Sequence, residues 1–131
     1  MRRNIGRLHV ISAWLLVAGI LGQALLAGLA LRNLGGTGDF GLHVELGYTL
    51  IGLLALAVVL TAVGAGRERR STLIALGLLL LYFVQTALPA LREVLPAMAA
   101  LHVVNALVMF ALASWFALRA GRALWSVDRP A

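Results

Sequence analysis

The chain has 131 residues, of which 62% are hydrophobic and 12% are charged. Soluble domains contain about 45–50% apolar and about 25% charged residues, and so small a body has too little interior to hide this apolar surplus. A water-soluble globule is therefore excluded, and the solvent for most of the chain is expected to be lipid. The absence of cysteine excludes disulfides, thiolate metal sites, a cysteine nucleophile and covalent c-type haem attachment.

Four long apolar runs follow one another, at residues 8–31, 42–66, 71–91 and 96–118. A helix needs about 20 residues to cross the hydrocarbon core of a bilayer, so each run is long enough to span it. Short connections between successive helices make them antiparallel neighbours. The sequence therefore predicts a single domain over residues 1–131, an all-α integral membrane up-down four-helix bundle without a separate soluble domain.

The arginines are distributed unevenly between the two sides of this bundle. Nine lie before the first run, between the second and third, or after the fourth, and only Arg32 and Arg92 lie on the other side. The nine are Arg2, Arg3, Arg7, Arg67, Arg69, Arg70, Arg119, Arg122 and Arg129. Short cytoplasmic loops carry the excess of positive charge, so both termini are expected in the cytoplasm. The net charge of +6 then comes from arginines that surround the cytoplasmic end of the bundle and face the lipid bilayer. Nucleic acid is therefore not an expected partner.

Polar side chains within spans are costly and usually face the bundle interior. Here they gather in the extracytoplasmic half: Gln23, His43, Tyr48, Tyr82, Gln85, His102 and Asn105. The inner half is expected to be close to pure hydrocarbon. His9 has no histidine at its level and is expected to lie at the cytoplasmic interface.

His43 and His102 stand out because they occupy parallel spans at similar depth. Spans two and four lie on the diagonal of an up-down bundle, and bundle cores commonly hold cofactors between facing helices. Neutral imidazole is a strong iron ligand, so the pair is the candidate iron ligand set of a haem. Gly47, one turn below His43, leaves room for a flat ring, and Gln85 and Asn105 are further candidate contacts.

The two extracytoplasmic arginines extend this hypothesis. Arg32 and Arg92 end spans one and three on the side of the histidines, where they are expected to pair with the anionic propionates of a haem. The alternative is that they are ordinary loop residues paired with Asp39 and Glu93. Pro89 leaves the carbonyl of Gln85 without its helical donor, which predicts a local kink.

Two segments resemble known families. Residues 39–48 (DFGLHVELGY) and 101–107 (LHVVNAL) are similar to the signatures of a small, uncharacterised four-span bacterial membrane family, which implies a multi-pass protein of the bacterial inner (plasma) membrane. A histidine opening span two and another in span four also resembles one four-helix half of haem A synthase and b-type cytochrome-like bundles. In those proteins the corresponding histidines ligate haem, so the resemblance also points to His43 and His102.

The sequence therefore predicts a b-type cytochrome-like membrane protein with one non-covalent haem b, axial ligands His43 and His102, and a role in electron transport. A quinone or a respiratory membrane complex is the expected partner, and a homo-oligomer is compatible with the sequence. Whether the protein is an enzyme is left open. The alternative is a cofactor-free structural or assembly subunit whose polar layer joins helices. A small transporter is less favoured, because no acidic residue lies at the midplane and no inverted repeat is visible.

Overall fold

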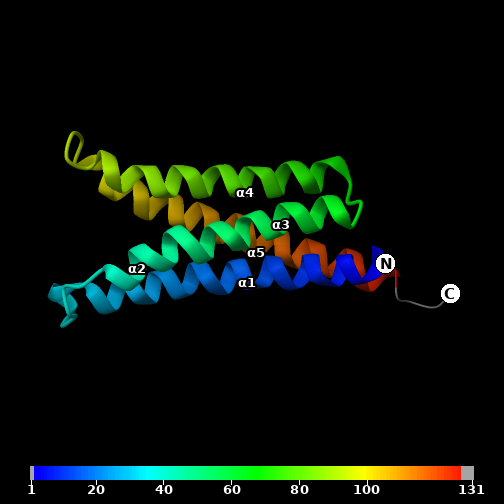
Figure 1. Cartoon of the computed structure of the whole chain (residues 1–131), viewed down its shortest axis with the longest axis horizontal. Helices are drawn as coiled ribbons and strands as arrows, with labels where there is room; N and C mark the ends of the chain where they lie inside the picture. Colours follow the sequence, from blue (N-terminus) through cyan, green and yellow to red (C-terminus); the bar gives the residue numbers. More distant parts are fainter. Residues whose placement is uncertain (1, 128–131) are drawn as a thin grey trace.

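The computed structural model describes residues 2–127, and this part of the chain is helical apart from its turns and loops (Figure 1). The elements are α1 (Arg2–Ala30), η1 (Arg32–Leu34), α2 (Gly41–Leu46), the π-helical turn η2 (Gly47–Ile51), α3 (Gly52–Gly64), α4 (Arg69–Ala87), the 3₁₀ turn η3 (Leu88–Leu91) and α5 (Ala97–Val127). Four continuous segments, Arg3–Ala30, Gly41–Gly64, Arg69–Leu91 and Ala97–Leu124, are long and apolar enough to span a membrane. The predicted all-α four-helix membrane bundle is confirmed.

The helices form a closed ring of neighbours. α1 packs against α3 and α5, and α4 packs against the same two helices. The second and fourth spans therefore lie on one diagonal, because each is a neighbour of the first and the third.

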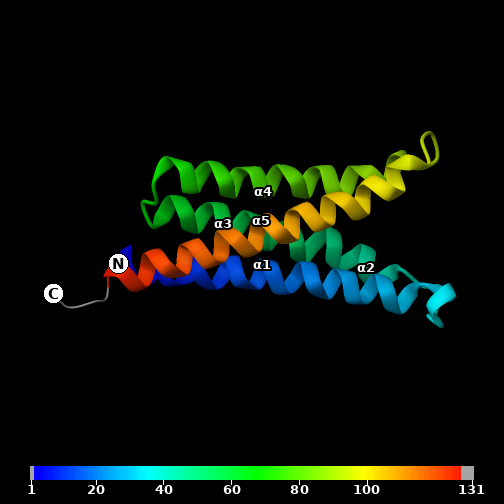
Figure 2. The same cartoon turned by 180° about the vertical axis from the view of Figure 1, so that it is seen from behind.

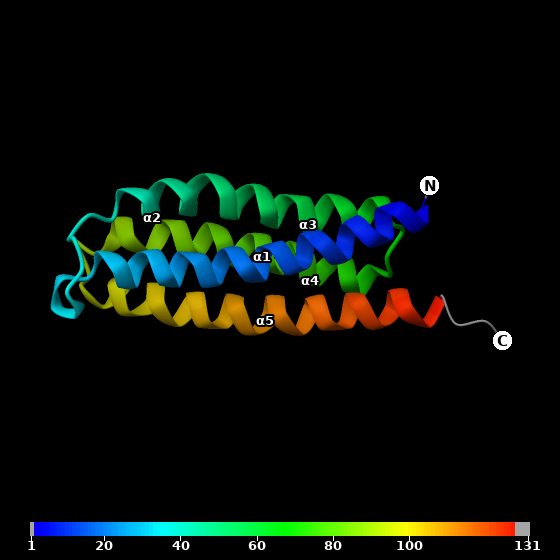
Figure 3. The same ribbon diagram turned by 90° about the horizontal axis from the view of Figure 1, so that it is seen from below.

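The two ends of the bundle differ. The start of α1, the α3–α4 connection and the last turns of α5 share one end (Figures 1 and 3), which we call the arginine-rich end. The α1–α2 and α4–α5 connections lie at the opposite end, which we call the histidine end. Toward the histidine end the α1–α2 pair diverges from the α4–α5 pair (Figures 1 and 2).

Large apolar side chains cover the outside of the bundle on every span. Leu25, Leu53, Leu80 and Leu107, one from each span, are 63–65% exposed. Water would penalise this arrangement, at about 25 cal/mol for each Å² of apolar surface, whereas hydrocarbon does not. The outer faces therefore fit a protein whose solvent is lipid.

The tightly packed core occupies only part of the length. Leu16, Val58, Leu78, Met109 and Phe116 are its largest fully buried apolar side chains. No residue in 31–50 or 83–108 is buried, so the histidine end is the loosely packed end, in agreement with the divergence of the two helix pairs.

Candidate functional site

His43 of α2 and His102 of α5 meet across the bundle diagonal at the histidine end. Their ring centroids are 6.3 Å apart and their planes are inclined by 75°. Both side chains are half-buried. The structure therefore brings together the two histidines that the sequence singles out.

His102 is held by the end of the third span. Its Nδ1 lies 3.0 Å from the backbone carbonyl oxygen of Gln85. Pro89 has no N–H to offer this carbonyl, and the chain tightens into the 3₁₀ turn η3 at Leu88. A carbonyl only accepts, so His102 donates through Nδ1–H and keeps its lone pair on Nε2.

His43 is held in the same way by the first span. Its Nδ1 lies 3.1 Å from the backbone carbonyl oxygen of Gln23. With its amide nitrogen facing His43, the Gln23 side chain donates to the His43 carbonyl (2.8 Å) and accepts from the Gly47 N–H (3.2 Å), while the same nitrogen lies 3.0 Å from Nδ1. In the tautomer with the proton on Nδ1, His43 donates to this carbonyl and carries the lone pair on Nε2. In the other tautomer, Nδ1 accepts from the Gln23 amide.

Gly47 serves this contact with Gln23. A Cβ at position 47 would lie 3.2 Å from the end of the Gln23 side-chain amide, at the atom that faces His43, which is tighter than an ordinary contact. The small residue thus lets the glutamine side chain reach the backbone of the second span.

Gln85 and Asn105 complete the polar layer beside His102. The Gln85 side-chain nitrogen lies 3.2 Å from Nε2 of His102 and donates to its lone pair. Asn105 donates through Nδ2 to Gln85 Oε1 at 2.7 Å and to the Leu81 carbonyl at 3.0 Å. The predicted residues Gln85 and Asn105 therefore belong to one network with His102.

The two arginines of this end make local contacts. Arg92 pairs with the neighbouring Glu93 at 3.2 Å, and both side chains are largely exposed. Arg32 packs over Gly38, whose φ of 82° belongs to the left-handed region. The pair of Arg92 with Glu93 is the one expected if Arg92 is an ordinary loop residue.

The second span makes a π-helical turn between its histidine and its regular helical part. Tyr82 of α4 donates through its hydroxyl to the carbonyl of Tyr48 in this turn at 2.7 Å. A Cβ at Gly52 would lie 2.6 Å from the Tyr82 hydroxyl oxygen. The tyrosine therefore ties α4 to the second span directly below His43, and this contact depends on a glycine.

The inner half of the bundle is not pure hydrocarbon, so that expectation is wrong. His9 is 1% exposed, so its side chain lies inside the bundle, and its Nδ1 lies 3.1 Å from the Thr61 hydroxyl. Ser12 also contacts this hydroxyl at 3.1 Å. Thr61 donates to the Ala57 carbonyl at 2.6 Å, so it accepts from His9. The i, i+3 spacing of His9 and Ser12, which gives them one helix face, is the sequence signal for this cluster.

Within residues 2–127 no group of three or more His, Asp or Glu side chains is placed to hold a metal ion. The two-histidine pair is thus no metal site by itself. Such a pair suits a metal that arrives with its own equatorial ligands, as iron does in a porphyrin.

No known family model matches this sequence, and neither curated proteins nor solved structures show a significant similarity to it. Function must therefore be argued from the residues themselves.

Proposed function

We propose that the chain is a b-type cytochrome-like membrane protein that binds one non-covalent haem b between His43 and His102. The observation that carries the proposal is the anchoring of both imidazoles. In each imidazole, Nδ1 lies within hydrogen-bond distance of a backbone carbonyl oxygen. Donation from Nδ1–H to that oxygen leaves Nε2 as the ligating nitrogen. Histidines that bind metals commonly have this outer partner, because it fixes the tautomer and the ring orientation.

The separation of the rings supports the same assignment. Metal–nitrogen bonds of about 2.0–2.1 Å, plus roughly 1.1 Å from each nitrogen to its ring centre, put two imidazole centroids on opposite sides of one ion about 6.2–6.4 Å apart. The observed centroid separation of 6.3 Å falls in this range. Ligation of one metal ion by two imidazoles sets no particular angle between their ring planes, so the angle of 75° is compatible with shared ligation.

The surroundings supply adjustable polar groups and contain no tightly packed core. No residue in 31–50 or 83–108 is buried, so a flat ring here would displace no packed core. To free Nε2 of His102 for a metal, Gln85 would turn its amide nitrogen away from it. Asn105 would still donate to the Gln85 side chain. Gly47 adds no side chain to this space. Arg32 and Arg92 are the cations of this end that would bind the propionates. To do so, they would give up the exposed local contacts described above.

Haem, when bound, supplies a reversible one-electron carrier. The chain's contribution is to hold two neutral imidazoles in a fixed tautomer and to exclude water with the apolar helices around them. A membrane quinone or a respiratory membrane complex is the proposed electron partner, because the site lies within a bundle that has no soluble domain in residues 2–127.

We also propose that the arginine-rich end faces the cytoplasm of a bacterial cell and that the protein resides in the inner membrane. The arginine imbalance between the two ends supports this orientation. Fusion of green fluorescent protein or alkaline phosphatase to the C-terminus tests it. We expect fluorescence and no phosphatase activity, and the reverse result would contradict the orientation.

The deciding experiment is an absorption spectrum of protein expressed with supplied haem and purified in detergent. We expect a Soret band and a sharp reduced α-band in the wild type, both lost in His43→Ala and His102→Ala. His9→Gln is the matched control, because it changes the third histidine and is expected to keep the spectrum.

Added imidazole guards against loss of the bands through misfolding. It fills the cavity left by alanine and is expected to restore the bands if ligation alone was lost. A folded wild-type protein that stays colourless with full haem supply would overturn the proposal. It would favour a cofactor-free structural or assembly subunit, whose histidine variants would instead weaken association with a partner complex.

A further inference from the structure

A second polar site lies at the arginine-rich end and plays no part in the proposed haem site. It is a pocket of about 380 Å³, and its lining includes His9 of α1, Arg67 and Glu68 of the α3–α4 connection, Ser71 of α4, and Phe116 and Arg119 of α5. Three helices and a loop thus converge on a cavity that contains two guanidinium groups.

Arg67 is held in place by one hydrogen bond and has further N–H donors for a ligand. Its Nη2 donates to the backbone carbonyl of Ala120 at 3.2 Å, which ties the loop to α5. A guanidinium carries five N–H donors in a planar fork, so this single bond leaves others for a ligand in the pocket.

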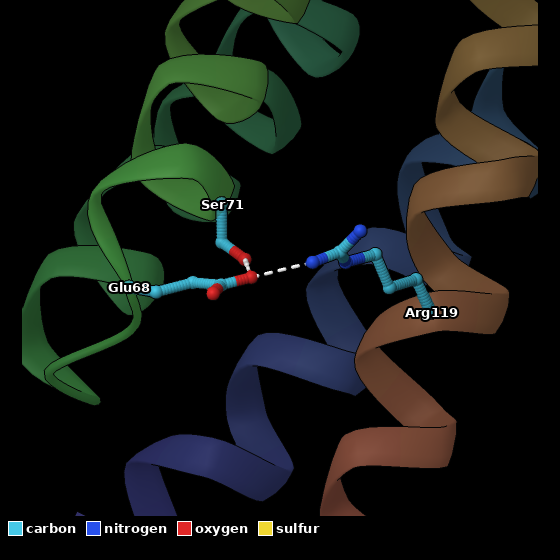
Figure 4. A network of polar contacts seen from close by, with 3 residues as sticks. All are labelled: Glu68, Ser71 and Arg119. Carbon is cyan, nitrogen blue, oxygen red and sulfur yellow. Dashed lines mark hydrogen bonds and ion pairs between the residues drawn. The ribbon is translucent and has the colours of Figure 1, made fainter.

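Arg119 already holds an anion that the chain supplies. Its Nη2 lies 2.6 Å from Oε1 of Glu68, and Ser71 donates to the same oxygen at 3.4 Å (Figure 4). The guanidinium also lies over the ring of Trp115, at 5.7 Å from the centroid. The Glu68 carboxylate therefore marks where Arg119 binds an oxyanion.

This internal anion is easily displaced. The Glu68 and Arg119 side chains are 59% and 37% exposed, and exposed ion pairs contribute little stability. Glu68 is also the one carboxylate that residues 2–127 bring to this end, which carries the arginines Arg2, Arg3, Arg7, Arg67, Arg69, Arg70, Arg119 and Arg122. The local field therefore favours an additional anion.

We propose that this pocket binds a phosphate-bearing anion, either a lipid head group or a soluble phosphate ester, on Arg67 and Arg119, with Glu68 as the carboxylate that it displaces. Planar guanidinium forks match phosphate oxygens. The pocket is larger than a phosphate group alone, and Phe116, Ala120 and Ala123 in its wall suit the carbon atoms of an ester. Clusters of arginine next to a membrane span attract anionic lipid head groups.

Two kinds of probe separate the sources. Native mass spectrometry of protein released from vesicles of phosphatidylcholine, with or without phosphatidylglycerol, reports a retained lipid. Titration with inorganic phosphate or glycerol phosphate, followed by tryptophan fluorescence, reports a soluble ligand, since release of Arg119 from Glu68 changes the surroundings of Trp115. Trp115→Phe is expected to remove that signal.

Opposite changes in affinity are expected from the two partners of the ion pair. Glu68→Gln frees Arg119 and is expected to tighten binding up to about fivefold, the worth of an exposed ion pair. Arg67→Gln and Arg119→Gln each remove charge-assisted hydrogen bonds and are expected to weaken binding about tenfold or more. Glu93→Gln, the same charge change at the histidine end, is the matched control and is expected to leave binding unchanged.

Each outcome bears on the proposal. Tightening by Glu68→Gln is a gain that misfolding does not produce, so it supports the pocket even if an arginine variant is unstable. If Glu68→Gln and Glu93→Gln changed the affinity equally, net charge alone would explain the effect, and the proposed site would be refuted. Unchanged binding of both probe classes in Arg67→Gln and Arg119→Gln would also overturn it. None of these measurements depends on haem.

Discussion

Replacement of Gly52 by alanine tests the packing beneath the histidine pair. The new Cβ would lie 2.6 Å from the hydroxyl oxygen and 2.8 Å from Cζ of Tyr82. Tyr82 is buried, and its rigid ring moves only as a whole. Relief of the overlap therefore requires a shift of α3 against α4, and it breaks the hydrogen bond from Tyr82 to the Tyr48 carbonyl.

The expected magnitude combines three contributions. Overpacking costs about 1–3 kcal/mol, and loss of the tyrosine hydrogen bond costs about 1 kcal/mol. Replacement of a helical glycine by alanine returns about 1 kcal/mol. The free energy of unfolding of Gly52→Ala should therefore fall by about 1–3 kcal/mol.

Gly77 of α4 offers a matched control, because a Cβ at that position meets nothing within 4 Å. Gly77→Ala should gain up to about 1 kcal/mol, so the two variants should differ by about 2–4 kcal/mol. Unfolding in detergent, followed by circular dichroism over a denaturant series, measures both. Equal stability of the two variants would refute the close packing of Tyr82 on Gly52.

Three further substitutions test other contacts. Thr61→Val removes the hydroxyl that accepts from the buried His9 and should lower the free energy of unfolding by about 1–3 kcal/mol in the same assay. The hydroxyl of Thr49 donates to Glu45 of its own span, so Thr49→Val should lower it by less than half as much. Pro89→Ala restores a backbone N–H that competes with His102 for the carbonyl of Gln85. In a haem titration it should weaken the proposed binding more than Pro96→Ala does, and equal affinities would contradict this. Glu93→Gln breaks an exposed pair and should change stability by no more than about 1 kcal/mol; a larger loss would show that the pair is not merely a surface contact.

Much of the histidine site was predictable from the sequence. His43 and His102 are recognisable because polar groups within spans are costly and are retained where they face the bundle interior. The free carbonyl of Gln85 follows from Pro89 alone. That His102 takes this carbonyl was not predictable, because it depends on the rotation of α5 against α4.

The cluster of His9, Ser12 and Thr61 was missed for a related reason. His9 lies two residues after Arg7, a position that is compatible with an interface. Its burial results from the edge-on packing of Phe116, with ring centroids 5.4 Å apart, and of Thr61 from another span. Such partners are separated by tens of residues in the chain, and no local pattern identifies them.

By itself, the sequence determined that this protein has four lipid-facing helices in alternating directions, because length and hydropathy decide where a helix can cross a bilayer. It also determined which end carries the arginines. Only the tertiary structure decided which side chains touch: the 6.3 Å approach of the two histidines and the ion pair between Glu68 and Arg119. Such contacts depend on the rotation and depth of each helix against its neighbours, and packing across the whole bundle sets these.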